Sequence, residues 1–278
     1  MFASIKPSLI ETSPMSRFPV FLKTHKKLWI PLGVALFLIF VISSIPAIWG
    51  AYALTRGTGV ALSGVTGTVW NGRASLASVR TADQEYSLGQ LSWSLSPLSL
   101  LTLSPCAHVT TKLNLQQFEG EVCSGTGGKL RVSDADVSLS AALVQGRIPV
   151  PIQGQLSAHI DELDVRGNIL QKLKGKLTWN GARVNTGANW LDIGSYAAEL
   201  SDNGKNGVKA KFFQLTGPVD VNLQIELTAP AGGKVTGELA APKAFFEGAN
   251  AIDMLAMFSQ EDRVDEQGKT HYRVDVNL

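Results

Sequence analysis

The sequence predicts a mainly β protein in which one N-terminal transmembrane helix precedes a domain of antiparallel, amphipathic β-sheet. Three observations predict this fold class. An uncharged apolar run occupies residues 28–54. The segments after it alternate between apolar and polar residues, which is the period of a half-buried strand. Turn-forming Gly, Asn and Asp separate these segments, and the 278 residues include 27 glycines.

The run at residues 28–54 has the length of a membrane span. At about 1.5 Å per residue, a helix of this length exceeds the roughly 30 Å hydrocarbon layer of a bilayer. Trp29 and Trp49 are spaced so that their amphipathic rings reach the two headgroup levels. We therefore expect one transmembrane helix over 28–54, which Pro46 could kink or end.

The charges that flank the run predict its orientation. Basic residues precede it at Lys6, Arg17, Lys23, Lys26 and Lys27, whereas only Arg56 and Arg73 follow closely. A basic excess stays in the cytoplasm. Residues 1–27 are then a cytoplasmic tail, and residues 55–278 are exported.

Two alternatives concern the N-terminal region. The small residues Ala51 and Ala53 fit a signal-peptide cleavage site, but the apolar run is longer than a signal peptide requires and bulky Trp49 precedes the site. We therefore favour an uncleaved anchor. Met15 is a plausible alternative start, which leaves open whether residues 1–14 are translated.

Composition argues against several classes of partner and cofactor. The formal net charge is +2, and no concentrated basic stripe follows the anchor, so nucleic-acid binding is not expected. The four histidines are scattered along the chain, whereas a zinc site needs four converging ligands. We expect no metal and no cofactor.

Cys106 and Cys123 are the two cysteines, and both lie in the exported part. An even number of cysteines in an oxidising compartment predicts one disulfide. Closure of a loop of this size is worth about 3 kcal/mol in the chain-entropy model. Two unpaired buried thiols are the alternative.

The first expected folded unit after the anchor is a hairpin within residues 60–74. Asn71 and Gly72 form the pair that supplies positive φ to a two-residue turn. Residues 88–95 then alternate as a strand through Trp93, and Pro97 stops it. Residues 98–103 form a short apolar connector.

The sequence Trp-Asn-Gly recurs at residues 179–181, about 109 residues after its first occurrence. This recurrence predicts two related halves, about 60–165 and 166–278, each with a hairpin at this motif. The alternative is that the motif recurs only because it suits hairpins.

Other elements follow from periodicity. Alternation predicts strands at 132–144, at 152–160 and, most cleanly, at 219–227, with a bulge near Asp161 and Glu162 where the parity changes. Residues 245–258 approximate one helix face. A turn at residues 265–268 leads into a final strand.

Catalysis is not indicated. The chain has no Gly-x-Ser-x-Gly elbow, and residues 125–129 resemble a phosphate loop but lack its Ser or Thr, so they predict a turn. Asp134 and Asp136 could form an acid–base pair, but a solvated strand face explains them better. We predict no catalytic residues, and the protein is not expected to be an enzyme.

Two motifs carry a family resemblance. The first is the stretch that contains Gly64, Gly67, Trp70, Asn71 and Gly72, and the second places Trp93 before Pro97 and a leucine-rich connector. Both resemble type II secretion system protein N, the general secretion pathway protein N family. The order of tail, anchor and β domain also resembles this family.

The resemblance implies an accessory or scaffold component in the inner membrane, with a cytoplasmic N-terminus and a periplasmic C-terminal domain. It implies contacts with other type II secretion subunits, on the inner-membrane platform or the outer-membrane secretin side, and with membrane lipid. It also implies kinship to AsmA-like proteins, whose curved sheets present a hydrophobic groove. A periplasmic carrier of lipid or another apolar ligand is therefore the alternative function.

Overall fold

The computed structural model describes residues 26–56, 59–80, 85–147, 150–185, 187, 189–229, 232–248, 255–256 and 258–277. The chain divides into two compact units, Met1–Ser44 and Ile45–Leu278, and each is described by itself.

The apolar N-terminal run does not form one helix. Helix α1 covers Lys26–Ser43, and a separate helix α2 covers Ala47–Thr55 in the second unit. Pro46 is the N-cap of α2, and its missing N–H ends the helical hydrogen-bond ladder there. The single helix expected over 28–54 is thus wrong in its extent. Across the described residues, no helix meets the length and hydropathy that a bilayer crossing requires.

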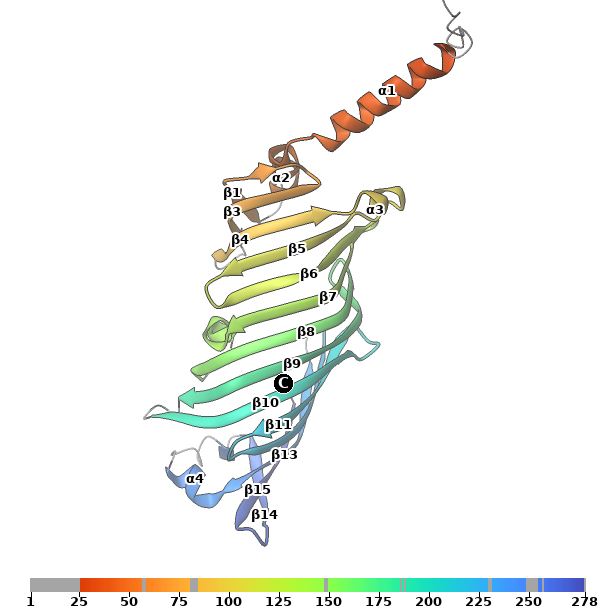
Figure 1. Cartoon of the computed structure of the whole chain (residues 1–278). Coiled ribbons are helices and arrows are strands. Elements are labelled where there is room, and N and C mark those ends of the chain that lie inside the picture. Colours follow the sequence, from red (N-terminus) through yellow and green to blue (C-terminus); the bar gives the residue numbers. More distant parts are fainter. Residues whose placement is uncertain are drawn as a thin grey trace, which may run out of the picture. The chain divides into compact units, whose positions relative to one another are not determined.

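The second unit is one 15-stranded antiparallel sheet, as far as the described residues extend, and its strands pair largely in chain order (Figure 1). The strands are β1 (Val60–Ser63), β2 (Thr66–Gly67), β3 (Asn71–Arg80), β4 (Glu85–Leu95), β5 (Cys106–Leu113), β6 (Gln116–Gly125), β7 (Lys129–Ser140), β8 (Ile152–Arg166), β9 (Ile169–Asn185), β10 (Trp190–Asp202), β11 (Gly207–Thr216), β12 (Asp220–Thr228), β13 (Gly233–Pro242), β14 (Ser259–Val264) and β15 (Lys269–Asn277). The prediction of a mainly β, antiparallel fold is confirmed.

Short helices connect some of the strands. Helix α3 (Pro97–Leu101) joins β4 to β5, the 3₁₀ helix η1 (Ala141–Arg147) follows β7, and α4 (Lys243–Gly248) follows β13. The helix predicted over 245–258 therefore agrees at its start. Residues 249–254 and 257 of that prediction lie outside the described residues.

Several local predictions are confirmed. Strand β12 covers the cleanest alternating segment, and residues 125–129 form the turn between β6 and β7. The β8–β9 register shifts between Ile160 and Glu162, where the parity change predicted a bulge. The last hairpin turns at residues 265–268, where the Asp265 N–H donates to the Lys269 carbonyl.

The predicted turn at Asn71 and Gly72 is wrong by two residues. The β2–β3 hairpin exists, but Gly67 already pairs with Gly72, and the Thr68 N–H donates to the Asn71 carbonyl over 2.9 Å. The connection is therefore Val69 and Trp70. Gly72 is required for close packing instead, because a Cβ there would lie 2.2 Å from the Trp93 ring.

The second Trp-Asn-Gly sequence forms no hairpin. Strand β9 runs through it, and Gly181 has φ of 58° where the β8–β9 and β9–β10 registers both become irregular. The glycine thus serves a bulge inside a long strand. A boundary near residue 165 falls at the β8–β9 turn, and the strands on its two sides belong to the same sheet. The internal duplication itself stays a prediction.

The tightest packing lies in the C-terminal half of the sheet. One cluster of buried and partly buried side chains joins strands β9–β13, strand β15 and Leu255 around Tyr196, which is 1% exposed. Tyr196 stacks on Phe212 with ring centroids 5.3 Å apart. Its hydroxyl donates to the Ile193 carbonyl over 2.6 Å and lies 3.2 Å from the Val219 carbonyl oxygen. Burial raises the pKa of Tyr196, so the phenol keeps its proton.

Candidate binding surface

One face of the sheet is apolar across most of its strands. Residues that pair directly on antiparallel strands share a face. Phe118 pairs with Val137, Val137 with Ala158, and Ala158 with Leu177. The same face continues through further pairs: Leu177 with Ala198, Ala198 with Phe212, Phe212 with Leu223, Leu200 with Ala210, Ala210 with Ile225, and Ile225 with Val235. Apolar side chains thus form an unbroken band across the strand direction.

This apolar face is only partly covered. Phe118, Val137, Leu156 and Leu177 are all partly buried and keep part of their surface exposed. Of the side chains described, the largest that are fully buried are Tyr196 and Thr270. The face is therefore only partly covered over β6–β9, and its large side chains are buried mainly in the C-terminal cluster around Tyr196.

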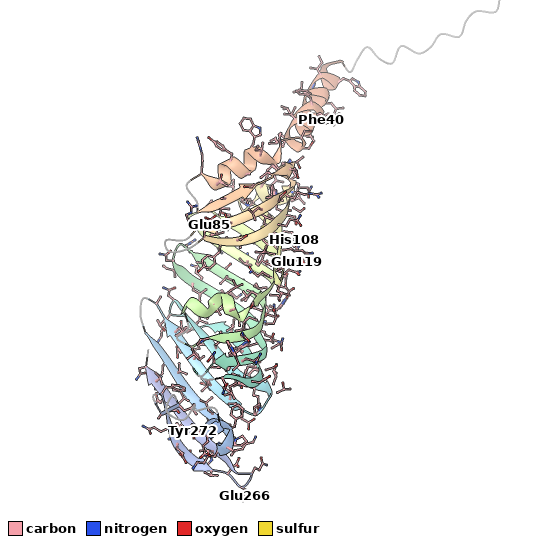
Figure 2. All side chains as sticks on the ribbon, turned by 90° about the vertical axis from the view of Figure 1, so that its left-hand side faces the viewer. Phe40, Glu85, His108, Glu119, Glu266 and Tyr272 are labelled. Carbon is pink, nitrogen blue, oxygen red and sulfur yellow. A yellow bond between two sulfur atoms is a disulfide. The ribbon has the colours of Figure 1, made fainter. Side chains whose placement is uncertain are left out.

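The opposite face carries charges of both signs. Lys172 and Glu162 approach to 2.6 Å, Lys234 and Asp275 to 3.4 Å, and Lys209 and Glu226 to 3.9 Å. Farther toward β1, His108 and Glu119 lie side by side on β5 and β6, 3.3 Å apart (Figure 2). Such pairs keep this face solvated and add little stability.

The motif residues gather where β2, β3 and β4 meet. The Trp93 indole N–H donates to the Val69 carbonyl over 2.9 Å, and the indole ring lies against Gly72. The Ser94 hydroxyl donates to the Asn71 side-chain oxygen over 2.8 Å. Gly64 and Gly67 have φ of 64° and 93°, the left-handed region that favours glycine. These hydrogen bonds join the β2–β3 connection to β4.

Two more predicted residues adjoin this region. Pro97 starts α3, where its fixed φ suits the first helical turn. Cys106 and Cys123 form a disulfide with sulfurs 2.06 Å apart, and they are paired residues of β5 and β6. The bond therefore closes one hairpin beside α3.

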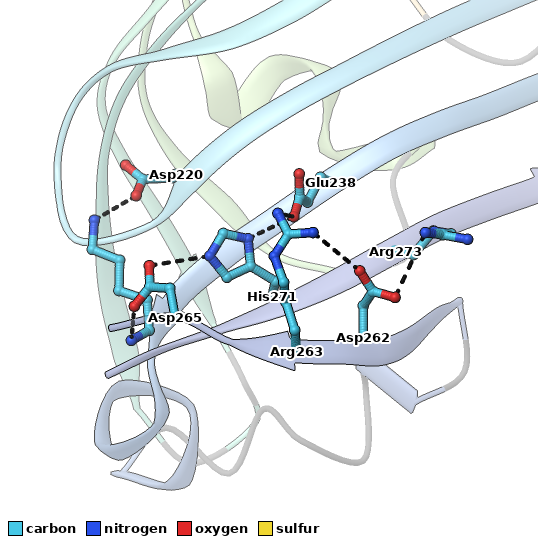
Figure 3. Close-up of polar contacts among 8 residues, drawn as sticks. Asp220, Glu238, Asp262, Arg263, Asp265, His271 and Arg273 are labelled. Carbon is cyan, nitrogen blue, oxygen red and sulfur yellow. Dashed lines mark hydrogen bonds and ion pairs between the residues drawn. The ribbon is translucent and has the colours of Figure 1, made fainter. Parts of the chain in front are cut away.

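A charged network that the sequence reasoning missed lies at the C-terminal edge (Figure 3). His271 on β15 contacts Glu238 on β13 through Nδ1, and its Nε2 lies 3.1 Å from Asp265. Arg263 on β14 reaches Glu238 at 3.0 Å. The β13–β15–β14 pairing brings these residues together. The sequence alone does not reveal the contact, because Glu238 and His271 are 33 residues apart.

Hydrogen bonds in this network shift two pKa values. Those to Asp265 and Glu238 raise the pKa of His271. The pKa of Asp265 is lowered chiefly by the hydrogen bond from the Lys269 backbone N–H and next by the one from His271. The network therefore favours an imidazolium between two carboxylates, which ties β13, β15 and the β14–β15 turn together.

Possible catalytic or metal-binding groups are few in the described part of the chain. His159 Nδ1 lies 2.8 Å from Asp136, and both side chains are exposed to solvent. Asp134, which the sequence placed with Asp136, is a positive-φ residue at an irregularity in the β6–β7 pairing. Cys106, Glu121 and Cys123 are close enough to share a metal, but the two cysteines are joined to each other. These groups serve as surface contacts and a cross-link.

Comparison with known proteins decides the family. The model of the family described as "Type II secretion system (T2SS), protein N" matches residues 58–268. The chain belongs to this type II secretion system protein N family. The match covers most of the sheet, including the corner built around Trp93, so the predicted resemblance is confirmed.

Two relatives carry the name of the protein N family. "Type II secretion system protein N" of Aeromonas hydrophila is 30% identical over 149 residues, which are 51% of this chain and 57% of the relative. The protein of the same name from Vibrio cholerae serotype O1 is 28% identical over 167 residues, 58% of this chain and 65% of the relative. The chain thus spans less than two thirds of either relative. No solved structure matches it.

Proposed function

We propose that this chain is an accessory or scaffold component of the type II secretion system in the inner membrane. It supports the export of folded proteins across the outer membrane through protein–protein contacts of its sheet, without breaking or making a bond in its cargo. The family match over residues 58–268 is the observation that supports this proposal most strongly.

The proposal places the sheet in the periplasm and uses the apolar run at residues 28–54 as the anchor. The large side chains of α1 that point outward are apolar, and among them Trp29, Phe37 and Phe40 are each more than 60% exposed. A helix that is apolar all round is stable when lipid surrounds it. The Cys106–Cys123 disulfide agrees with an oxidising compartment.

A tethered sheet can assemble through individually weak contacts, because the membrane raises its effective concentration toward other anchored subunits. The outermost strand β14 suits such a contact. In the part of the chain that the structure describes, β14 pairs with β15 only, so its other side can accept a partner strand. Its charged residues Glu261, Asp262 and Arg263 discourage uncontrolled pairing between copies.

Photo-cross-linking in cells tests the scaffold role. A photo-reactive amino acid at Gln260, exposed on β14, is expected to capture another secretion subunit. The matched control is Gln117, which is also exposed but lies on the interior strand β6. Deletion of the gene is expected to reduce the release of exported proteins. Normal release, together with no subunit captured at Gln260, would refute the proposal.

The open apolar face supports a second candidate, a periplasmic carrier of lipid or another apolar ligand. An unbroken band of partly exposed apolar side chains is the kind of surface that such a ligand covers. A photo-reactive residue at Phe118 on this face is expected to label lipid in the carrier case. The neighbouring Gln117, on the polar face, is expected to label none. Equal labelling at the two positions would remove this candidate.

A further inference from the structure

The connection between β4 and β5 exposes four leucines on one short turn. Residues 96–105 contain α3, and the exposed fractions of Leu98, Leu100, Leu101 and Leu103 are 75%, 40%, 82% and 73%. The sequence has no Asp, Glu, Lys or Arg between Glu85 and Lys112. The turn is therefore an apolar surface without charged neighbours in its own segment.

Several polar groups of this turn bond within it. The Ser99 hydroxyl donates to the Ser96 carbonyl over 2.6 Å and accepts from the Cys106 N–H over 2.8 Å. The Thr102 hydroxyl and the Ser104 N–H both donate to the Ser99 carbonyl. Groups that are already bonded within the turn lose little when water is removed, so the turn can enter an apolar medium at low cost.

Leu103 points to a surface role as well. Its φ is 55°, a left-handed conformation that disfavours residues with a Cβ and is commonly held by Gly or Asn. Its side chain is 73% exposed and therefore adds little packing in return. An unfavourable backbone that presents an exposed leucine is typical of a functional surface.

Helix α2 adds a second apolar surface at the same corner of the sheet. The Val69 N–H donates to the Ile45 carbonyl just before α2, and the Leu95 N–H donates to the Trp70 carbonyl just before α3. The helix buries its small residues Ala47 and Ala51, while Ile48, Trp49 and Tyr52 are 62%, 69% and 56% exposed. Its large apolar side chains thus point away from the sheet, opposite to a soluble amphipathic helix.

We propose that the turn at residues 96–105 forms a second contact with the lipid bilayer beside the outer face of α2, whose residues 47–54 already belong to the anchor at residues 28–54. The inference rests on the membrane location proposed above. The leucines enter the edge of the acyl-chain region, and Trp49 and Tyr52 lie at the headgroup level. Arg56 lies 4.4 Å from the Tyr52 ring centroid, which places a cation where anionic headgroups would be.

A lipid partner suits this surface better than a protein partner. Protein interfaces surround their apolar centre with a polar rim and about one hydrogen bond per 100–200 Å². The turn offers no charged side chain, and its Ser99 and Thr102 hydroxyls already donate within it. Lipid acyl chains require no such donor or acceptor. A two-point contact would also fix how the β1–β5 end of the sheet stands on the membrane.

Spin labels on the full-length chain test this contact. Leu101→Cys carries a nitroxide while the Cys106–Cys123 disulfide remains intact, and the protein is reconstituted in phosphatidylethanolamine and phosphatidylglycerol vesicles. The matched control is Leu115→Cys, because Leu115 is 72% exposed and lies in the turn at the other end of the β5–β6 hairpin. We expect the ratio of oxygen to nickel-complex accessibility to be severalfold higher at position 101 than at position 115.

The outcomes separate this inference from the proposed function. If the chain floats with the vesicles but the labels at positions 101 and 115 are equally accessible to the nickel complex, the second contact is refuted and the anchor stands. If the chain does not float with the vesicles, the membrane location and the second contact both fail. A label at Leu98→Cys must agree with the label at position 101, and protection at position 101 alone would also refute the contact.

Discussion

Thr270 places a hydroxyl in a fully buried position at the C-terminal edge of the sheet. Its side chain is 0% exposed, and Oγ1 has no hydrogen-bond partner in the described part of the chain. A buried hydroxyl without a partner loses its hydration and gains nothing in return. Thr270→Val, which keeps the shape of the side chain, is therefore expected to raise the free energy of unfolding by about 1 kcal/mol. Urea denaturation of the full chain in detergent measures this.

A second threonine provides the control for Thr270. Thr178 donates its hydroxyl to the Ser157 carbonyl over 3.3 Å, so Thr178→Val removes a bond and is expected to lower the free energy of unfolding. If both variants lose stability, the Thr270 hydroxyl has a partner in solution and the prediction is wrong.

At the scale of the elements, His271 makes the β13–β15–β14 edge sensitive to pH. Hydrogen bonds to Asp265 and Glu238 raise its pKa, and the smaller opposing effects are desolvation by burial and then the charge of Arg263. A raised pKa in the folded state means that the stabilisation is complete below the unfolded value of about 6.5 and is lost as the pH rises through the folded pKa. The edge is expected to be more stable at pH 5.5 than at pH 8.5.

Hydrogen exchange of the β14 and β15 amides, corrected for intrinsic rates, measures this change. His271→Gln is expected to abolish the difference between the two pH values, whereas His108→Gln, on β5, is expected to keep it. The lowered pKa of Asp265 acts only near and below its usual value of 3.8, outside this window. Equal protection of the wild-type edge at pH 5.5 and pH 8.5 would contradict the prediction.

The β5–β6 hairpin is the element that the disulfide controls. The bond closes a loop with a sequence separation of 17. Loop-closure entropy predicts that Cys106→Ala/Cys123→Ala lowers the free energy of unfolding by about 3 kcal/mol. Reductant should destabilise the wild type to the same extent and leave the double variant unchanged. A further loss on adding reductant to the variant would show that the bond is not the cause.

At the scale of the whole molecule, alternation predicted the strands well because side chains on a one-layer sheet have only two directions. Strand β12 and the bulge near Glu162 follow from parity alone. The position of the turn predicted at Asn71 and Gly72 did not follow from the sequence. The turn propensity of this pair depends only on neighbouring residues, whereas Gly72 is required by the Trp93 ring on another strand. Tight turns and close packing both favour glycine, so the two roles look alike in the sequence.

The candidate surfaces were less predictable than the strands. The motif around Trp93 could be found in the sequence, although its glycines serve packing more than turns. The His271 network depends on β15 lying between β13 and β14, an order that periodicity cannot give. The outward direction of Ile48 and Trp49 depends on α2 packing through its small residues. Long-range pairing and packing decide these features.

A sheet whose strands pair mainly with chain neighbours should not be equally stable along its length. Each strand contacts those beside it, much as in a repeat protein, where stability is a sum of local terms. The buried cluster around Tyr196 joins only β9 and later strands and Leu255. We therefore expect slower native-state hydrogen exchange in β10–β13 and β15 than in β3–β6.

Tyr196 tests whether this cluster is the cause of the gradient. Tyr196→Ala removes the ring that stacks on Phe212 and the hydroxyl that donates to the Ile193 carbonyl, so it is expected to speed exchange across β10–β13. Phe118→Ala, a large-to-small change on the open part of the same face, is expected to act only on β5–β7. If Tyr196→Ala instead raised exchange evenly from β3 to β15, the sheet would unfold as one cooperative unit and the gradient would have another origin.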